Sequence, residues 1–175
     1  VVELIGGEEL ELVHNHHNFA WEESHRGRTV VVVRKGATPA FPGQKGFIGG
    51  SMGDDAVIVE GATLPDGSQS AHRQREALFS TVHGAGRVMS RVAAKGRWRK
   101  GELVKPGRVT HDMMRAWLDE RNVVLRGGDL DESPHAYRRL PDVLAAQGDT
   151  IEVLHTLRPL VVCMAPGNTR DPYKD

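Results

Sequence analysis

Cysteine is nearly absent from the chain, with Cys163 the only one among 175 residues. A single thiol cannot form an internal disulfide, and such cysteine usage is typical of a reducing compartment. The sequence also lacks an apolar run approaching the ~20 residues that cross a bilayer, and it does not open with the charged and apolar regions of a signal peptide. These absences predict a cytoplasmic protein with no membrane association.

An excess of charge of either sign is missing too, because 23 Lys and Arg residues balance 23 Asp and Glu residues. A globally basic nucleic-acid-binding protein is therefore not indicated. Hydrophobic residues make up 39% and charged residues 26% of the chain, which is typical of a folded protein. We expect 1–175 to form a single compact domain.

Charge is nevertheless uneven along the chain. Between Gly84 and Gly101 there are six basic residues and no acidic one, and Trp98 lies among them. A basic segment with an aromatic residue can bind a phosphate backbone. The alternative, a solvated basic surface, remains open.

The apolar pattern predicts strands in both halves of the chain. Segment 29–34 is rich in β-branched residues and predicts a buried strand. Segment 151–164 predicts strand structure that Pro159 interrupts. Since no βαβ alternation is present, we expect an α+β fold with a mixed or antiparallel sheet and flanking helices. The polar end, 166–175, predicts a disordered tail.

Two helix starts can be recognised in the second half. Thr110 predicts an N-cap before a helix that carries Trp117 and Leu118 on its apolar face. Ser133, followed by proline, predicts the start of a helix over 134–147. The acidic residues just before Ser133 are expected near a helix start from the helix dipole, although they could also bind a cation.

A glycine-rich turn separates two predicted strands in the first half. Segment 47–53 pairs a short apolar entry with this turn, and a second strand is predicted over 56–59. The pattern is typical of a hairpin, and equally of a loop whose backbone N–H groups hold a ligand. Both interpretations remain open at this stage.

A second glycine-rich segment contains His83, followed by Gly84, Ala85 and Gly86. After His83, apolar residues recur at helical spacing (Ala85, Val88, Met89, Val92), and so do basic ones (Arg87, Arg91, Lys95). We expect a helix that begins beside His83, where free N–H groups favour an anion and the arginines can hold phosphate. A histidine there can bind metal, transfer a proton or attack phosphorus. A loop followed by a solvated basic helix is the simpler alternative.

Histidines also cluster near the start of the chain, at His14, His16 and His17. Imidazole is a common ligand of first-row transition metals. Neither helical nor strand spacing would bring all three to one ion, and surface or hydrogen-bonded histidines are the alternative.

These motifs together resemble a known family, the RtcB-type RNA ligases. The matching segments are His17-Asn18-Phe19-Ala20, Arg34-Lys35-Gly36-Ala37, Gly49-Gly50-Ser51-Met52-Gly53, His83-Gly84-Ala85-Gly86-Arg87 with Met89-Ser90-Arg91, Asp131-Glu132-Ser133-Pro134-His135-Ala136-Tyr137, and Leu157-Arg158-Pro159. The resemblance runs from about residue 14 to 165, and it implies a part of the RtcB-like fold.

The resemblance implies a GTP- and manganese-dependent ligase that joins 3′-phosphate and 5′-hydroxyl RNA ends, such as tRNA halves or broken RNA. His83 matches the nucleophile that forms a guanylyl-histidine intermediate, and His17 matches a ligand of Mn²⁺. Arg87 and Arg91 match arginines that hold RNA phosphate. The residues matching the site for GTP and its GMP product are His17, Asn18, Gly49, Gly50, Ser51, Met52, His83, Gly84, Ala85 and Gly86.

Only the C-terminal portion of that family is matched, and the chain begins with Val1 rather than Met. We therefore expect a piece of a longer enzyme, with the remaining manganese ligands in an N-terminal part that would act as its partner. Met164 or Ala165 stands where the family usually has a lysine near its end, which is typical of a divergent relative. A non-catalytic RtcB-like subunit that binds nucleotide or RNA ends is the alternative function.

Overall fold

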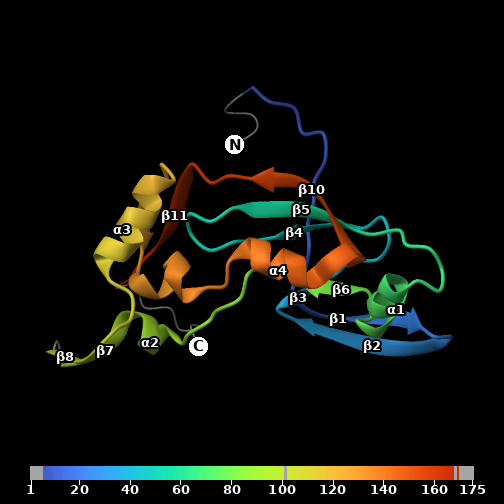
Figure 1. Cartoon of the computed structure of the whole chain (residues 1–175), viewed down its shortest axis with the longest axis horizontal. Helices are drawn as coiled ribbons and strands as arrows, with labels where there is room; N and C mark the ends of the chain where they lie inside the picture. Colours follow the sequence, from blue (N-terminus) through green and yellow to red (C-terminus); the bar gives the residue numbers. More distant parts are fainter. Residues whose placement is uncertain (1–5, 101, 168, 170–175) are drawn as a thin grey trace. The chain divides into compact units, whose positions relative to one another are not determined.

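The computed structural model describes residues 6–100, 102–167 and 169 (Figure 1). Its strands are β1 Asn18–His25, β2 Arg28–Lys35, β3 Ala37–Pro39, β4 Lys45–Ile48, β5 Ala56–Gly61, β6 Ser80–Val82, β7 Gly96–Arg99, β8 Glu102–Pro106, β9 Val124–Gly128, β10 Ile151–Leu157 and β11 Val161–Pro166. Its helices are α1 Gln69–Glu76, α2 Arg91–Lys95, α3 His111–Glu120 and α4 Leu140–Gln147, with 3₁₀ turns η2 Leu130–Glu132, η3 Pro134–Ala136 and η4 Gly148–Thr150. Small sheets and a few helices make this an α+β fold, which confirms the predicted class.

The chain divides into two compact units, and each is described by itself. Unit 1 comprises Val1–Phe47, Ile58–His83 and Asp149–Leu154. Unit 2 comprises Ile48–Val57, Gly84–Gly148 and His155–Asp175.

Unit 1 contains the antiparallel ribbon of β1 and β2, in which Asn18 lies opposite Lys35 and His25 opposite Arg28. The predicted strand at 29–34 is present in β2, but the expectation that it is buried is wrong for one face. Val32 is only 5% exposed, whereas Val33 is 72% exposed. Successive side chains of a strand point to opposite faces, and this two-stranded ribbon is covered on one face only.

A buried ion pair lies on the covered face of this ribbon. The Arg34 guanidinium, 2% exposed, donates to both carboxylate oxygens of Glu23 over 2.6 and 3.0 Å. Arg34 also donates to Ser80 Oγ and to the Leu78 carbonyl. His25 lies 2.7 Å from the same carboxylate. Every charge in this cluster therefore has a partner, as burial requires.

Unit 2 contains the parallel pair β9–β11 and the antiparallel pair β7–β8. Ala94 of α2, Val109 just before α3 and Ala136 of η3 form a buried apolar cluster, and Tyr137 packs against it. Thr110 caps α3 as predicted, since its Oγ1 accepts a hydrogen bond from Met113 N. Strands β10 and β11 lie on either side of Pro159, which confirms the predicted interruption.

Two helix predictions are wrong in extent. The helix expected from Gly84 begins only at Arg91, because Ser90 Oγ caps α2 at Ala93 N and the preceding Val88 N bonds instead to the Ala136 carbonyl. The helix expected over 134–147 is divided into η3 and α4. Pro141, in the first turn of α4, cannot continue a helix from the preceding residues because it lacks an N–H and its ring clashes with the carbonyl one turn earlier.

The strands predicted around the first glycine-rich turn are β4 and β5, which are neighbours in the three-stranded sheet β10-β5-β4. Of the predicted tail 166–175, residue 168 and residues 170–175 lie outside the described residues. Pro166 ends β11, and its carbonyl accepts a hydrogen bond from Thr169 N. Within the described ranges, no helix is long and apolar enough to span a membrane.

Candidate functional site

His83 and His17 come together in unit 1. Their rings are stacked almost parallel, with centroids 4.7 Å apart and an interplanar angle of 7°. Gly36 holds this pair closely, since its N–H donates to the His17 carbonyl over 2.8 Å and a Cβ on Gly36 would lie 3.6 Å from the His83 ring. Gly36 also has φ +72°, a conformation that favours glycine. The Arg34-Lys35-Gly36-Ala37 motif thus contributes its glycine to the histidine pair.

The environment of His83 favours its neutral form. Partial burial lowers the pKa of His83, and the neighbouring His17 imidazole lowers it further. A neutral imidazole keeps one nitrogen lone pair, which a nucleophile or a metal ligand needs. Asn18, the third predicted residue in this unit, accepts a hydrogen bond from Gly36 N over 3.1 Å and so lies beside the same glycine.

In unit 2, the two predicted glycine-rich segments lie side by side. Gly49 and Gly84 form a parallel bridge, and Ala85 N donates to the Gly49 carbonyl over 3.0 Å. A Cβ on Gly84 would lie 3.1 Å from the Gly49 carbonyl oxygen, and one on Gly50 would lie 2.2 Å from the Asp55 carbonyl oxygen. A side chain does not fit at Gly50 without a backbone shift, which explains why glycine stands there.

The turn over 49–53 also contains a polar atom without a partner. Ser51 Oγ is buried and makes no hydrogen bond within the described part of the chain. Buried hydroxyl groups normally have a partner, so this oxygen is available to a ligand polar group. The neighbouring Met52 is buried, and Gly86, on the adjoining segment, has φ +75°.

The side chains that support this turn were not predicted from the sequence. Trp117 Nε1 donates to the Gly53 carbonyl over 3.3 Å, and Arg139 Nη2 lies 3.2 Å from the buried Asp54 carboxylate. These residues come from α3 and from the start of α4, 60 or more positions away along the chain. Local patterns show Trp117 only as one apolar position of a helix, so the sequence offers no signal for this contact.

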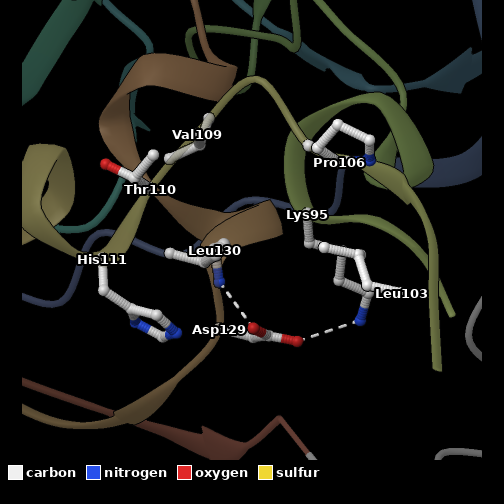
Figure 2. Close-up of a pocket in the computed structure, with 9 residues that line it drawn as sticks. Lys95, Leu103, Pro106, Val109, Thr110, His111, Asp129 and Leu130 are labelled. Carbon is white, nitrogen blue, oxygen red and sulfur yellow. Dashed lines mark hydrogen bonds and ion pairs between the residues drawn. The ribbon is translucent and has the colours of Figure 1, made fainter. Parts of the chain in front are cut away.

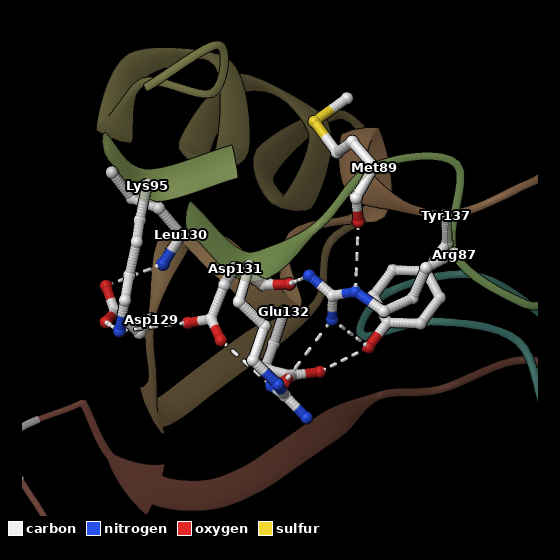
Figure 3. Close-up of polar contacts among 9 residues, drawn as sticks. Arg87, Met89, Lys95, Asp129, Leu130, Asp131, Glu132 and Tyr137 are labelled. Atoms are coloured by element: carbon white, nitrogen blue, oxygen red, sulfur yellow. Dashed lines mark hydrogen bonds and ion pairs between the residues drawn. The ribbon is translucent and has the colours of Figure 1, made fainter. Parts of the chain in front are cut away.

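Arg87 is committed to contacts within unit 2 (Figure 3). Its guanidinium donates to the Met89 carbonyl, the Tyr137 hydroxyl and the Asp131 carbonyl over 3.2, 2.8 and 2.6 Å. The guanidinium carbon also lies 4.8 Å from the centroid of the Tyr137 ring. This network restricts the predicted role of Arg87 as an RNA clamp, since each of its three nitrogens already donates to a protein acceptor.

Arg91 and Lys95 face an acidic segment that follows β9. Arg91 Nη1 donates to the fully buried Asp131 carboxylate over 2.9 Å and also to Glu132. Lys95 Nζ lies 2.9 Å from Asp129. These carboxylates raise the pKa of Arg91 and of Lys95. The acidic segment thus supplies the counter-charges of Arg91 and Lys95.

A cavity of about 500 Å³ lies beside the Lys95–Asp129 pair (Figure 2). Its remaining lining is mostly apolar and comes from β8, the start of α3 and η2, with residues Leu103, Pro106, Gly107, Val109, Thr110, His111 and Leu130. None of the predicted site residues lines this cavity.

Side chains that could bind a metal ion are dispersed in the described part of the chain. No group of three or more His, Cys, Asp or Glu residues in that part of the chain has the arrangement of a metal site. His14 and His16 contact each other edge to face at 4.8 Å, whereas His17 pairs with His83. His17 therefore offers one imidazole, and the described residues alone do not supply a complete ligand set.

Comparisons with known proteins identify a family that matches most of this chain. The family model described as tRNA-splicing ligase RtcB matches residues 4–165. The RNA-splicing ligase RtcB of Escherichia coli K12 is 38% identical over 155 residues, covering 89% of this chain and 33% of its own length. The enzyme of the same name from Mycobacterium tuberculosis is 33% identical, covering 80% and 33% of the two chains. The tRNA-splicing ligase RtcB of Thermococcus kodakarensis is 35% identical, covering 78% and 29%.

The chain thus spans about a third of the length of these curated relatives. The family model matches almost all of this chain, from residue 4 to residue 165. The matched range includes both glycine-rich segments and the histidine pair. On this evidence, the chain belongs to the RtcB family.

Proposed function

We propose that this chain is part of an RNA ligase that joins 3′-phosphate and 5′-hydroxyl RNA ends through a guanylyl-histidine intermediate. The RNA ligase names of its relatives support the general activity. The observation that carries the specific chemistry is the His17–His83 pair, because it presents a histidine of lowered pKa within a family motif.

His83 acts as the nucleophile in the first step. One of its ring nitrogens attacks the α-phosphorus of GTP, a nitrogen–phosphorus bond forms, and the bond to the pyrophosphate leaving group breaks. The RNA 3′-phosphate then takes the GMP from His83, and the 5′-hydroxyl attacks this activated end and releases GMP. Such covalent catalysis divides a difficult phosphoryl transfer into easier steps. The lowered pKa of His83 supports the first step because attack requires the unprotonated ring.

The glycine-rich segments 49–52 and 84–86 of unit 2 are the parts that we expect to hold the guanylate moiety. Glycine backbones permit close approach of a phosphate or a base, and the unpartnered Ser51 hydroxyl supplies a polar contact. The bridge between Gly49 and Gly84 supports this assignment, since it joins the two segments into one surface of unit 2.

Manganese would neutralise phosphate charge during both transfers. We propose that His17 supplies one of its ligands and that the others lie outside this chain, because no complete ligand set exists among the described residues. Arg91 is the better candidate for RNA phosphate. Only its Nη1 has a partner within the described structure, whereas all three nitrogens of Arg87 donate to protein acceptors.

The test is incubation with α-labelled GTP and Mn²⁺, followed by a denaturing gel. We expect an acid-labile label on the polypeptide that is lost in His83→Ala and retained in His155→Ala, a matched control at an exposed histidine. If the chain takes no label, the same assay is repeated with the upstream coding sequence restored. Label that persists in His83→Ala, or no label in the longer polypeptide, would refute the proposal.

A non-catalytic or divergent RtcB-like subunit that binds nucleotide or RNA ends is a second candidate. The incomplete set of metal donors in the described residues favours it. Binding of GTP without guanylylation, also in the longer polypeptide, distinguishes this candidate from the ligase.

A further inference from the structure

The turn over 49–53 has little regular structure of its own, so its shape depends on what surrounds it. Helix α3 packs directly against Gly53, because a Cβ at that position would lie 2.7 Å from Leu118 Cδ2. Gly53 has φ +70°, and its carbonyl accepts the Trp117 indole N–H over 3.3 Å. The end of the turn is therefore fixed from α3.

Two arginines join Trp117 to the residue that follows the turn. The guanidinium carbons of Arg139 and Arg121 lie 3.9 and 4.6 Å from the centroid of a Trp117 ring, within cation–π range. Both also face the buried Asp54 carboxylate, with nitrogen–oxygen distances of 3.2 and 3.9 Å. One indole thus holds the turn through its N–H and orients the cations that hold Asp54.

This support continues into the His83 motif. Asp54 N donates to the Ser51 carbonyl over 3.0 Å, which closes the turn, and the Gly49 carbonyl at its other end accepts from Ala85 N. A change in the turn would therefore alter the position of the Gly49 carbonyl and the segment bonded to it.

We propose that Trp117 is a positioning residue: together with Arg139 it fixes the conformation of the 49–53 turn and, through the Gly49–Ala85 hydrogen bond, the adjoining segment 84–86. The consequence for nucleotide binding rests on the proposed function. Trp117 itself need not touch the nucleotide. Trp117 instead affects the conformation of the backbone at 49–53 and 84–86, which is the part proposed to contact the nucleotide.

The experiment measures amide hydrogen exchange by NMR in the whole chain. In Trp117→Phe and Trp117→Leu, exchange at Ala85 and Asp54 should rise about tenfold relative to the hydrogen-bonded amide of Val124, with the larger rise in the leucine variant. The control Val109→Ala removes buried apolar volume elsewhere in unit 2, and should lower the melting temperature without changing this ratio. An unchanged ratio in both tryptophan variants would overturn the proposal.

A fluorescent GTP analogue separates this inference from the proposed function. If the wild-type chain binds the analogue, Trp117→Phe should weaken binding about tenfold while Val109→Ala does not. Unaltered affinity together with a raised exchange ratio would overturn the link to the nucleotide. If the wild-type chain binds none, the failure belongs to the proposed function of the isolated chain, and the exchange ratio alone decides the role of Trp117.

Discussion

The buried pair of Glu23 and Arg34 offers a strong test of how unit 1 is stabilised. Glu23→Gln keeps the shape of the side chain but leaves the Arg34 guanidinium, 2% exposed, without an anionic partner. Removing one member of a buried pair costs about 3–5 kcal/mol, because the remaining charge stays buried. For a chain of this length that corresponds to a drop in melting temperature of about 6–20 °C.

Chemical denaturation followed by circular dichroism measures the loss in the free energy of unfolding. The matched control is Glu76→Gln, which removes the partner of Arg26 in an exposed ion pair and should cost less than about 1 kcal/mol. The double variant Glu23→Gln/Arg34→Met should regain much of the loss, since it removes the uncompensated charge. Equal losses in Glu23→Gln and Glu76→Gln would refute the interpretation of Arg34 as a buried charge that requires its partner.

The same pair predicts a dependence on pH. Burial by itself raises the pKa of Glu23, but hydrogen bonds from Arg34 and His25 outweigh burial and lower the pKa below its ordinary value of 4.5. A carboxylate whose pKa is lower in the folded state contributes stability that is complete above about pH 4.5 and is lost as the pH falls through the lowered value. Wild type should therefore lose more stability than Glu23→Gln between pH 5 and pH 3. Parallel losses over that range would contradict the assignment.

The other predictions concern unit 2. Arg91→Ala should weaken the salt dependence of binding to 3′-phosphorylated RNA, because the slope of log binding constant against log salt concentration should fall by about 0.7 for one lost phosphate contact. Arg87→Ala should mainly lower the melting temperature. Equal slopes for Arg91→Ala and wild type would contradict the phosphate role. Burial first, and then Glu132, raise the pKa of Tyr137 to about 12, so a phenolate absorbance transition near pH 12 should disappear in Tyr137→Phe. Gly53→Ala should destabilise the chain by more than about 1 kcal/mol in chemical denaturation, because the residue has positive φ and its Cβ would meet α3.

The sequence predicts elements well where the signal is local. Thr110 as the cap of α3 and Pro159 as the interruption between β10 and β11 depend only on neighbouring residues, and both are confirmed. The helix expected after His83 fails because helical spacing of apolar residues competes with a stronger local signal. Ser90 is a good N-cap, and it begins α2 nearly two turns later than the periodicity suggests.

The glycine-rich segments of the candidate site could be identified from the sequence, but the side chains that pack against them could not. Glycine-rich motifs identified both segments that meet at the Gly49–Gly84 bridge, since the residue types themselves carry the constraint. The positions of Trp117 and Arg139 beside that turn depend on how α3 and α4 pack. No local pattern reports such packing, so these residues appear in the sequence only as part of ordinary helices.

The pairing of charged side chains could not be predicted from the sequence, although the charged residues themselves are evident in it. In the sequence, two charged features look separate. The basic side chains of Arg87, Arg91 and Lys95 suggest a phosphate-binding surface, whereas the acidic segment 129–132 suggests the start of a helix. In the folded chain the acidic segment supplies acceptors to all three basic side chains. Figure 3 shows these contacts for Arg87 and Lys95. An RNA phosphate would therefore meet a partly neutralised surface, on which the orientation of Arg91 matters more than the number of nearby positive charges. This is why the salt dependence of Arg91→Ala, rather than net charge, tests the proposed contact with RNA phosphate.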